Sequence, residues 1–238
     1  GASVELLHTA TLVHDDLIDG ALLRRGMPTL NARWSPAATV LTGDFLFARA
    51  AKLAAETDYL PLMKLFSDTL AVIVNGELTQ MFTARGVIDR DNYYSRIYAK
   101  TASLFEMSAL AAALVATEDE KTREAMRVFG YEVGMAFQIV DDILDFTGDQ
   151  STVGKPIGSD LLNGLVTLPA IYFAEEHPDD EDVLSLPGGG WKDTNRVQRL
   201  VDGIRKNAAI EKAMVEARQA VSRALSALDD APAVPEKE

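Results

Sequence analysis

The stretch VELLHTATLVHDDLID, residues 4–19, joins an apolar helical pattern to three carboxylates within its last five positions. From Leu7 through Thr11 to Asp15, the four-residue spacing places side chains on one face of a helix. Gly20 follows directly and predicts the end of that helix. The carboxylates are therefore expected at a helix C-terminus, where the helix dipole disfavours each negative charge by roughly 0.3–1 kcal/mol.

The same arrangement occurs a second time, because DDLID at 15–19 recurs as DDILD at 141–145, just before Gly148. In each motif the aspartates at the first and fifth positions are four residues apart, so two like charges share one helix face. A divalent cation would offset this repulsion, and hard oxygen ligands favour Mg²⁺ or Mn²⁺. A solvated acidic helix end is the alternative, but both motifs follow apolar residues. The candidate metal ligands are Asp15, Asp16, Asp19, Asp141, Asp142 and Asp145.

Composition excludes several classes of protein. The chain has 238 residues and a net charge of −13, which argues against a nucleic-acid partner. It has no cysteine, so disulfides, thiolate metal sites and cysteine nucleophiles are excluded, and a reducing compartment is favoured. No apolar run is expected to span a membrane and no signal peptide opens the chain, so the expected location is cytoplasmic.

Helical periodicity runs along nearly the whole chain, and strand signals are almost absent. We expect a single all-α domain over residues 1–230, with a disordered tail at 231–238. Linkers are expected at 154–158 and 186–193. TEDE at 117–120 reads as a capping box before the long helix that carries the second motif. The other expected helices cover 36–56, 61–81, 91–115, 194–206 and 208–229.

Cationic groups lie close to both motifs in the sequence. Arg24 and Arg25 stand side by side in a loop after the first motif, where guanidinium groups can fork onto phosphate oxygens. Lys100 lies in an apolar helix and Lys155 in a glycine-rich loop after the second motif. Lys100 could instead snorkel to solvent. Gln138 shares the helix face of the second motif, where a neutral amide could orient a polarised group.

Several segments, taken in order, resemble the trans-polyprenyl (isoprenyl) diphosphate synthases. They are LLHTATLVHDDLID, RRGMPTLN, LTGDFLFARA, NGELTQM, YAKTASLFE, AFQIVDDILDFTGD, GKPIGSDL and TLPAI. The resemblance implies a helical bundle of the type I isoprenoid synthase kind around a deep central cavity, with the two motifs facing each other across its mouth. It also implies a homodimer.

The resemblance further implies a Mg²⁺-dependent prenyltransferase. It assigns the allylic diphosphate to the six aspartates through Mg²⁺, and to Arg24, Lys100, Thr101 and Lys155. It places Arg25 on the isopentenyl diphosphate and Gln138 near the reacting allylic end. Metals and cations stabilise the departing diphosphate, and the isopentenyl double bond attacks the allylic cation. The three histidines need no acid–base role.

Three departures from the family pattern are visible. Nothing corresponds to the upstream Gly-Gly-Lys-Arg stretch that relatives use for isopentenyl diphosphate, so that part of the family domain is expected to be missing. Asn163, Gly164 and Leu165 stand where the family commonly has an acidic residue, glycine and lysine, so one diphosphate-facing lysine is lost. The chain also stops where relatives continue into a further helix.

Product length is expected to depend on the helix before the first motif. In the family, bulky aromatics four and five residues before the first aspartate stop growth at short products. Here those positions are Thr11 and Ala10, so we expect a product longer than fifteen carbons. The alternative functions are a class I terpene cyclase, a partner subunit without activity of its own, and a metal-binding helical scaffold.

Overall fold

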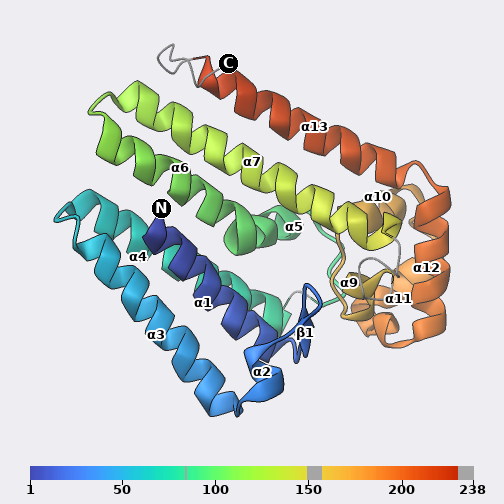
Figure 1. The fold of residues 1–238 in the computed structure, drawn as a ribbon. Coiled ribbons are helices and arrows are strands. Elements are labelled where there is room, and N and C mark those ends of the chain that lie inside the picture. Colours follow the sequence, from blue (N-terminus) through green and yellow to red (C-terminus); the bar gives the residue numbers. More distant parts are fainter. Residues whose placement is uncertain (84, 149–156, 230–238) are drawn as a thin grey trace. The chain divides into compact units, whose positions relative to one another are not determined.

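The protein is described by a computed structural model that covers residues 1–83, 85–148 and 157–229. Within these residues the chain is almost entirely helical, with a single two-stranded ribbon (Figure 1). The all-α prediction is confirmed. The chain divides into two compact units, the N-terminal unit Gly1–Thr69 and the C-terminal unit Leu70–Glu238. The expected domain boundary at residue 230 stays a prediction, and the tail at 231–238 lies outside the described residues.

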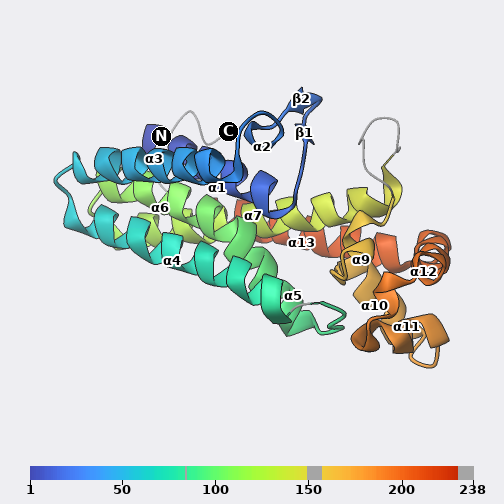
Figure 2. The ribbon, with the colours of Figure 1, turned by 90° about the horizontal axis from the view of Figure 1, so that it is seen from below.

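The N-terminal unit is built on two helices that lie side by side, α1 and α3 (Figures 1 and 2). Helix α1 spans Ala2–Ile18 and α3 spans Pro36–Ala55. Ser35 caps α3 by accepting a hydrogen bond from the backbone N–H of Ala38, and Pro36 follows at the first helical position, as the sequence predicted. Between these helices come β1 (Leu23–Arg24), β2 (Met27–Pro28) and α2 (Leu30–Arg33).

One stripe of α1 packs closely against α3. The Ser3 hydroxyl donates to the backbone oxygen of Ala50 at 2.8 Å. Near the other end of α1, the His14 ring occupies the space that a Cβ on Gly43 would need, because that atom would lie 2.1 Å from its Nε2. Ala10 lies on this stripe, one turn before His14, and is fully buried.

Helix α4 spans Leu60–Thr83 and therefore begins in the N-terminal unit and ends in the C-terminal one. The other helices all belong to the C-terminal unit, in which α6, α7 and α13 run side by side (Figure 1). Their bounds are α5 Arg90–Ile97, η1 Tyr98–Ala102, α6 Ser103–Ala116, α7 Glu120–Thr147, α9 Ser159–Leu162, α10 Leu168–Glu176, α11 Glu181–Ser185, η2 Leu186–Gly188, η3 Gly190–Lys192, α12 Thr194–Lys206 and α13 Ala209–Leu228.

Helix α7 comes unusually close to η1 and α6. A Cβ on Gly134 would lie 2.5 Å from the Cα of Ala102, and one on Gly130 would lie 2.6 Å from the backbone oxygen of Phe105. Real Cβ contacts are never this short, so only glycine permits the approach. Because Gly134 is one turn before Gln138, this close packing brings the polar end of α7 against η1.

The capping box expected at 117–120 is wrong in position. Thr117 ends α6, and the N-cap of α7 is Asp119, whose carboxylate accepts from the backbone N–H of Thr122 at 3.0 Å. The hydroxyl of Thr117 instead accepts from the N–H of Asp119 and holds the turn between the helices. Both side chains are good caps, and the tight α6–α7 turn decides which one begins the helix.

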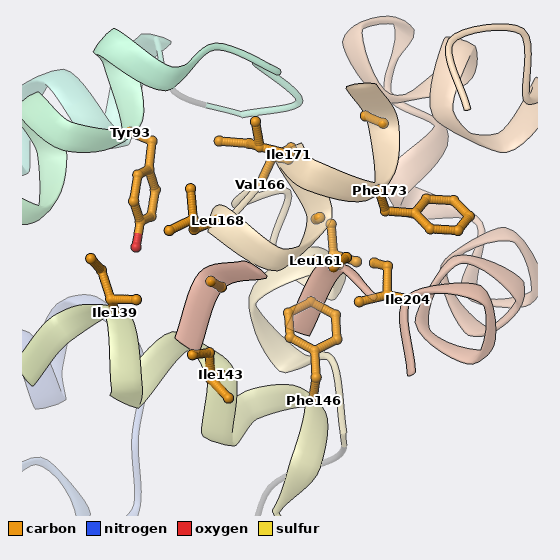
Figure 3. Close-up of a cluster of buried hydrophobic side chains, with 14 of the residues drawn as sticks. Tyr93, Ile139, Ile143, Phe146, Leu161, Val166, Leu168, Ile171, Phe173 and Ile204 are labelled. Carbon is orange, nitrogen blue, oxygen red and sulfur yellow. The ribbon is translucent and has the colours of Figure 1, made fainter. Parts of the chain in front are cut away.

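The core of the C-terminal unit gathers side chains from α5, α7, α10 and α12 (Figure 3). Ile139, Ile143 and Phe146 of α7 face Leu168 and Ile171 of α10, all nearly or fully buried. Burying aliphatic and aromatic side chains of this size contributes roughly 1.5–3 kcal/mol each. This core fixes the end of α7 on which the second aspartate motif lies.

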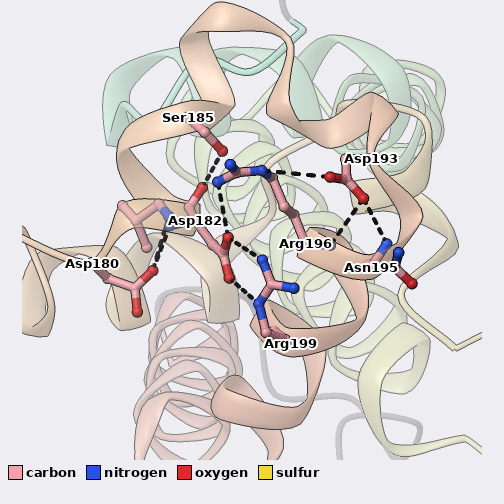
Figure 4. A network of polar contacts seen from close by, with 8 residues as sticks. Asp180, Asp182, Ser185, Asp193, Asn195, Arg196 and Arg199 are labelled. Carbon is pink, nitrogen blue, oxygen red and sulfur yellow. Dashed lines mark hydrogen bonds and ion pairs between the residues drawn. The ribbon is translucent and has the colours of Figure 1, made fainter.

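A carboxylate-centred network joins α11 to α12 (Figure 4). Asp182 accepts from Nε and Nη2 of Arg199, both at 2.7 Å, and from Nη1 of Arg196 at 3.1 Å. These guanidinium groups, Arg199 first, lower the pKa of the Asp182 carboxyl below its usual value. Asp193 caps α12 and also pairs with Arg196 at 3.6 Å. The segment expected as a linker at 186–193 contains the two short helices η2 and η3 and ends at the Asp193 cap.

The continuous helical run Arg90–Ala116 is long and apolar enough to cross a membrane by length and composition, which the sequence analysis did not anticipate. A core helix of a soluble protein passes the same test, so one such run does not by itself indicate a membrane-spanning helix. The run also carries Arg96, whose guanidinium donates to the backbone oxygen of Val166 at 2.7 Å. The expected cytoplasmic location stays a prediction.

Candidate functional site

The first aspartate motif lies at the C-terminal end of α1, as predicted. Asp19 is exposed and stands just after the last helical residue, and Asp15 is half-buried one turn earlier. Asp16 is only 7% exposed. Asp15 and Asp19 are therefore more exposed than Asp16.

The two arginines after this motif lie on a hairpin that the sequence did not predict. Arg24 ends β1, and Arg25 and Gly26 form its two-residue turn with φ of 51° and 76°. Two successive residues with positive φ are typical of a type I′ turn, for which a glycine in second place is the sequence signal. The hairpin folds Arg24 back over the motif, where its Nε donates to the Oδ1 of Asp16 at 2.9 Å. Arg25 is exposed at the tip.

The two positions predicted to set product length have different surroundings. Successive helical residues are rotated by about 100°, so Thr11 lies about 40° from Asp15 around α1 and Ala10 about 140° away. Thr11 is half-buried, and its hydroxyl donates locally to the backbone oxygen of His8. Ala10 faces α3 and is fully buried. The structure therefore favours the packing alternative for Ala10 and leaves the chain-length role as a prediction for Thr11.

The second motif lies at the C-terminal end of α7, again as predicted. Asp141 is exposed, Asp145 is half-buried and Asp142 is only 4% exposed. As in the first motif, the second aspartate is the buried one. Both carboxylates accept hydrogen bonds from donors of the protein, and the predicted metal contacts of Asp16 and Asp142 stay predictions.

Asp145 holds the start of α9. Its Oδ1 accepts from the N–H and the hydroxyl of Ser159 at 3.1 and 2.7 Å, and its Oδ2 accepts from the N–H of Asp160 at 3.1 Å. Its backbone oxygen accepts from Gly158, whose φ of 73° turns the chain into α9. The GSDL segment is therefore fixed to the second motif by Asp145.

Asp142 is bonded through both carboxylate oxygens. The Tyr93 hydroxyl donates to its Oδ2 at 2.7 Å, and the Gln138 side-chain amide donates to its Oδ1 at 2.9 Å. Burial raises the pKa of the Asp142 carboxyl to about 6, an effect that Gln138, Tyr93 and Arg96 partly offset. Burial raises the pKa of the Tyr93 phenol well above its usual value, so this hydroxyl remains a donor.

Gln138 connects the second motif to the KTA segment. Its Oε1 accepts from the hydroxyl of Thr101 at 2.6 Å. Thr101 and Lys100 lie in η1, a single turn of π-helix within the run from α5 to α6, and such turns are frequent at functional sites. The Lys100 ammonium lies 3.6 Å from Glu77 of α4, and the Lys100 side chain also reaches solvent. Gln138, Thr101 and the second motif thus lie together where η1 meets α7.

Two further groups of this site were missed. Tyr93 and Arg96 precede Lys100 by seven and four residues on the same continuous helical run. Burial lowers the pKa of the Arg96 guanidinium, which faces the charges of Asp142 and Asp160. The signal in the sequence was a tyrosine and an arginine at helical spacing before a predicted functional lysine.

The remaining candidates have these positions. Lys155 lies outside the described residues. Leu165, which replaces the family's lysine, donates its backbone N–H to the Asp160 oxygen at 2.8 Å and closes the turn after α9. His14 contacts the Val40 oxygen and His177 the Phe173 oxygen, so both have structural partners, whereas His8 is exposed.

The carboxylate ligands offered by the two motifs are of the type that Mg²⁺ prefers. Within the described residues, no three acidic, histidine or cysteine side chains lie close enough together to hold a metal without other ligands. Mg²⁺ is commonly held by one or two carboxylates, with waters and substrate phosphates completing its shell. Each motif offers such a pair at four-residue spacing: Asp15 with Asp19, and Asp141 with Asp145. The residues therefore fit a metal that binds together with a diphosphate.

Comparison with known proteins gives a consistent result. The family model described as polyprenyl synthetase matches residues 1–204. The all-trans-nonaprenyl-diphosphate synthase (geranyl-diphosphate specific) of Rhodobacter capsulatus is 41% identical over 236 residues, which cover 97% of this chain and 71% of that protein. The chain thus spans about seven tenths of this relative's length.

Solved structures agree with the sequence matches. The crystal structure of heptaprenyl diphosphate synthase from Staphylococcus aureus superposes with a TM-score of 0.92 at 34% identity, covering 99% of this chain and 74% of that one. The polyprenyl synthase of Caulobacter crescentus CB15, crystallised with calcium and isoprenyl diphosphate, gives 0.87 at 35% identity over 98% and 72% of the two chains.

Proposed function

Because the chain belongs to the polyprenyl synthetase family, we propose that it is a trans-prenyltransferase that condenses isopentenyl diphosphate with an allylic prenyl diphosphate. The observation that carries the proposal is the repetition of the aspartate motif, with the second aspartate of each motif buried and bonded to a side chain that we assign to the substrate site. Asp16 holds Arg24, and Asp142 holds Gln138 and with it Thr101. A scaffold or a terpene cyclase needs no such repetition of the motif.

The roles follow from the position of each group. Asp15, Asp19, Asp141 and Asp145 would hold Mg²⁺, which neutralises the diphosphate when bound. Asp16 would orient the Arg24 guanidinium so that its Nη atoms present to phosphate oxygens. Lys100 would add a positive charge on the allylic diphosphate, as would Lys155. The Caulobacter relative was crystallised with calcium and isoprenyl diphosphate, which supports a divalent cation and a prenyl diphosphate as the ligands.

The chemistry needs no nucleophilic side chain. The bond between the allylic carbon and the diphosphate oxygen breaks, and its electron pair leaves with the diphosphate. The isopentenyl double bond then forms the new carbon–carbon bond, and the resulting cation passes a proton to the released diphosphate. Arg24 and Lys100 stabilise charge where it develops on the leaving group, which is where fixed cations lower a barrier most. Gln138 and Thr101 face the allylic end with uncharged dipoles.

The finer parts of the proposal concern product and assembly. Small side chains before the first motif favour a product longer than fifteen carbons, and the nonaprenyl relative is named for a long-chain product. Homodimerisation and a cytoplasmic location are proposed by analogy with the family. Both are separate from the chemistry.

Product analysis tests the function. The protein is incubated with Mg²⁺, isopentenyl diphosphate and an allylic primer, and the products are sized after removal of the diphosphate. We expect a series of prenyl alcohols lengthened in five-carbon steps, with none when the primer or Mg²⁺ is omitted. A cyclic hydrocarbon formed without consumption of isopentenyl diphosphate would instead indicate a terpene cyclase.

The two arginines of the hairpin are expected to act on different substrates. Arg24→Lys keeps the charge but loses the Nε bond to Asp16, so kcat/KM for the allylic substrate should fall about ten-fold or more, the effect of losing one charged hydrogen bond. Arg25→Lys should instead raise KM for isopentenyl diphosphate. Steady-state kinetics with each substrate varied in turn measure both effects.

The control is Arg33→Lys, an exposed arginine of α2 in the same unit, which should leave both substrates unaffected. If Arg24→Lys and Arg25→Lys change the kinetics of the two substrates equally, the division between the arginines is refuted.

A further inference from the structure

Tyr93 is a fully buried tyrosine at the second motif to which the proposed chemistry gives no part. It is 0% exposed, and its ring packs in the core beside Ile139 and Leu168 (Figure 3). Its hydroxyl points toward α7 and donates to Asp142, 49 residues away along the chain. A phenol in such a core normally needs one hydrogen-bond partner, and a backbone oxygen would serve equally well. The partner here is instead a charged member of the functional motif.

The bond from Tyr93 is the first of three that lead to the substrate-facing groups. Asp142 accepts from Tyr93 on one oxygen and from the Nε2 of Gln138 on the other. This fixes the rotation of the amide, because a flipped amide would place its own oxygen against the carboxylate. The Oε1 of Gln138 is thereby turned toward Thr101, whose hydroxyl donates to it at 2.6 Å.

Helix α5, which carries Tyr93, also carries a positive charge that stabilises the Asp142 carboxylate. Arg96 lies one turn later on α5, and its positive charge acts favourably on the carboxylate. The Arg96 side chain is held in turn by the backbone oxygen of Val166. A buried carboxylate without such partners would be strongly disfavoured. Helix α5 therefore supplies both a hydroxyl donor and a cation that keep Asp142 in place.

We propose that Tyr93 is a positioning residue for prenyl transfer, which acts through Asp142 to fix the amide of Gln138 and the hydroxyl of Thr101. Tyr93 and Asp142 do not touch the substrate. The inference rests on the proposed function, because Gln138 and Thr101 receive their roles from it.

The test compares Tyr93→Phe with Tyr94→Phe. Both variants remove only a phenolic oxygen from α5, and Tyr94 donates to Glu216 of α13 and not to Asp142. In the metal-free protein, the side-chain amide resonance of ¹⁵N-labelled Gln138, assigned by its loss in Gln138→Ala, reports the orientation of the amide. We expect it to shift in Tyr93→Phe and to stay unchanged in Tyr94→Phe. An unchanged resonance in Tyr93→Phe overturns the proposal.

Kinetics supply a second readout. We expect Tyr93→Phe to lower kcat about ten-fold, as for the loss of one hydrogen bond to a charged group, with allylic KM changed less than about two-fold. In a Gln138→Ala background the same substitution should change kcat less than about two-fold, since the group it positions is gone. A full ten-fold effect in that background would show a merely structural role and overturn the proposal.

If Tyr93→Phe does not fold, Asp142→Asn takes its place. An asparagine has one acceptor oxygen and cannot accept from Tyr93 and Gln138 through two oxygens, so the Gln138 resonance should again shift, and an unchanged resonance overturns the proposal. The amide measurement needs no turnover. Failure of the wild type to make any prenyl product would therefore reject the proposed function while the amide still decides the positioning role.

Discussion

Asp15→Asn combined with Asp141→Asn is expected to abolish the rise in melting temperature that Mg²⁺ and inorganic diphosphate together produce, and to lower turnover by about 10³-fold or more. Each substitution removes the first aspartate of one motif. A ligand present at about 100 times its Kd stabilises the folded state by about 2.7 kcal/mol, which is a measurable shift. Thermal unfolding with and without the two ligands, followed by product assays, measures both effects.

The metal-free double variant should be as stable as the wild type or more so. Each motif places two carboxylates at four-residue spacing at a helix C-terminus, and removing one relieves both the mutual repulsion and the unfavourable helix dipole. The matched control is Asp58→Asn with Asp202→Asn, two exposed aspartates outside the motifs that change the net charge equally. A double motif variant that keeps the full shift with Mg²⁺ and diphosphate would contradict the metal role.

Local sequence signals were sufficient for most of the fold. Helix α12 spans Thr194–Lys206 as expected, because Asp193 caps it and a clear apolar stripe follows. Gly20 and Gly148 end the two helices that carry the motifs, and Pro36 opens α3. These predictions depend on residues within one or two turns of each other. The information is therefore present in the local chain.

Local sequence patterns did not predict the features of the fold that depend on tertiary contacts. Thr117 and Asp119 are both good caps, and only the tight turn between α6 and α7 selects Asp119. The π-turn at Lys100 and Thr101 has no simple residue signal, since it depends on how η1 packs against the glycines of α7. The two-residue strands around Arg25 are too short to show an alternating pattern.

The partners of the site were the least predictable part. Spacing placed Gln138 on the face of the second motif and correctly grouped it with the aspartates, because four residues make one helical turn. The contact between Tyr93 and Asp142 joins residues 49 positions apart and depends on how α5 packs on α7. Spacing also gave Asp142 the same role as Asp141, although neighbouring residues on a helix are rotated by about 100° and reach different surroundings.

The same rotation decides the prediction for product length. Thr11→Phe is expected to shorten the product to about fifteen carbons while the first condensation still works, because Thr11 lies on the Asp15 side of α1, one turn farther from the diphosphate. A phenyl ring there would meet the growing chain, whereas threonine is small and half-buried. Ala10→Phe should not shorten the product. Ala10 is fully buried against α3, so the larger ring should lower the free energy of unfolding by about 1–3 kcal/mol through overpacking.

The two variants show which position lines the tunnel for the growing chain and which only packs against α3, because both introduce phenylalanine at adjacent positions. Chromatography of the dephosphorylated products measures length, and urea unfolding of the metal-free proteins measures stability. If the wild type stops at fifteen carbons, or Thr11→Phe makes products as long as the wild type, Thr11 does not limit growth. If Ala10→Phe shortens the product at unchanged stability, its side chain reaches the growing chain. The close packing of α1 on α3 would then not hold in the working enzyme.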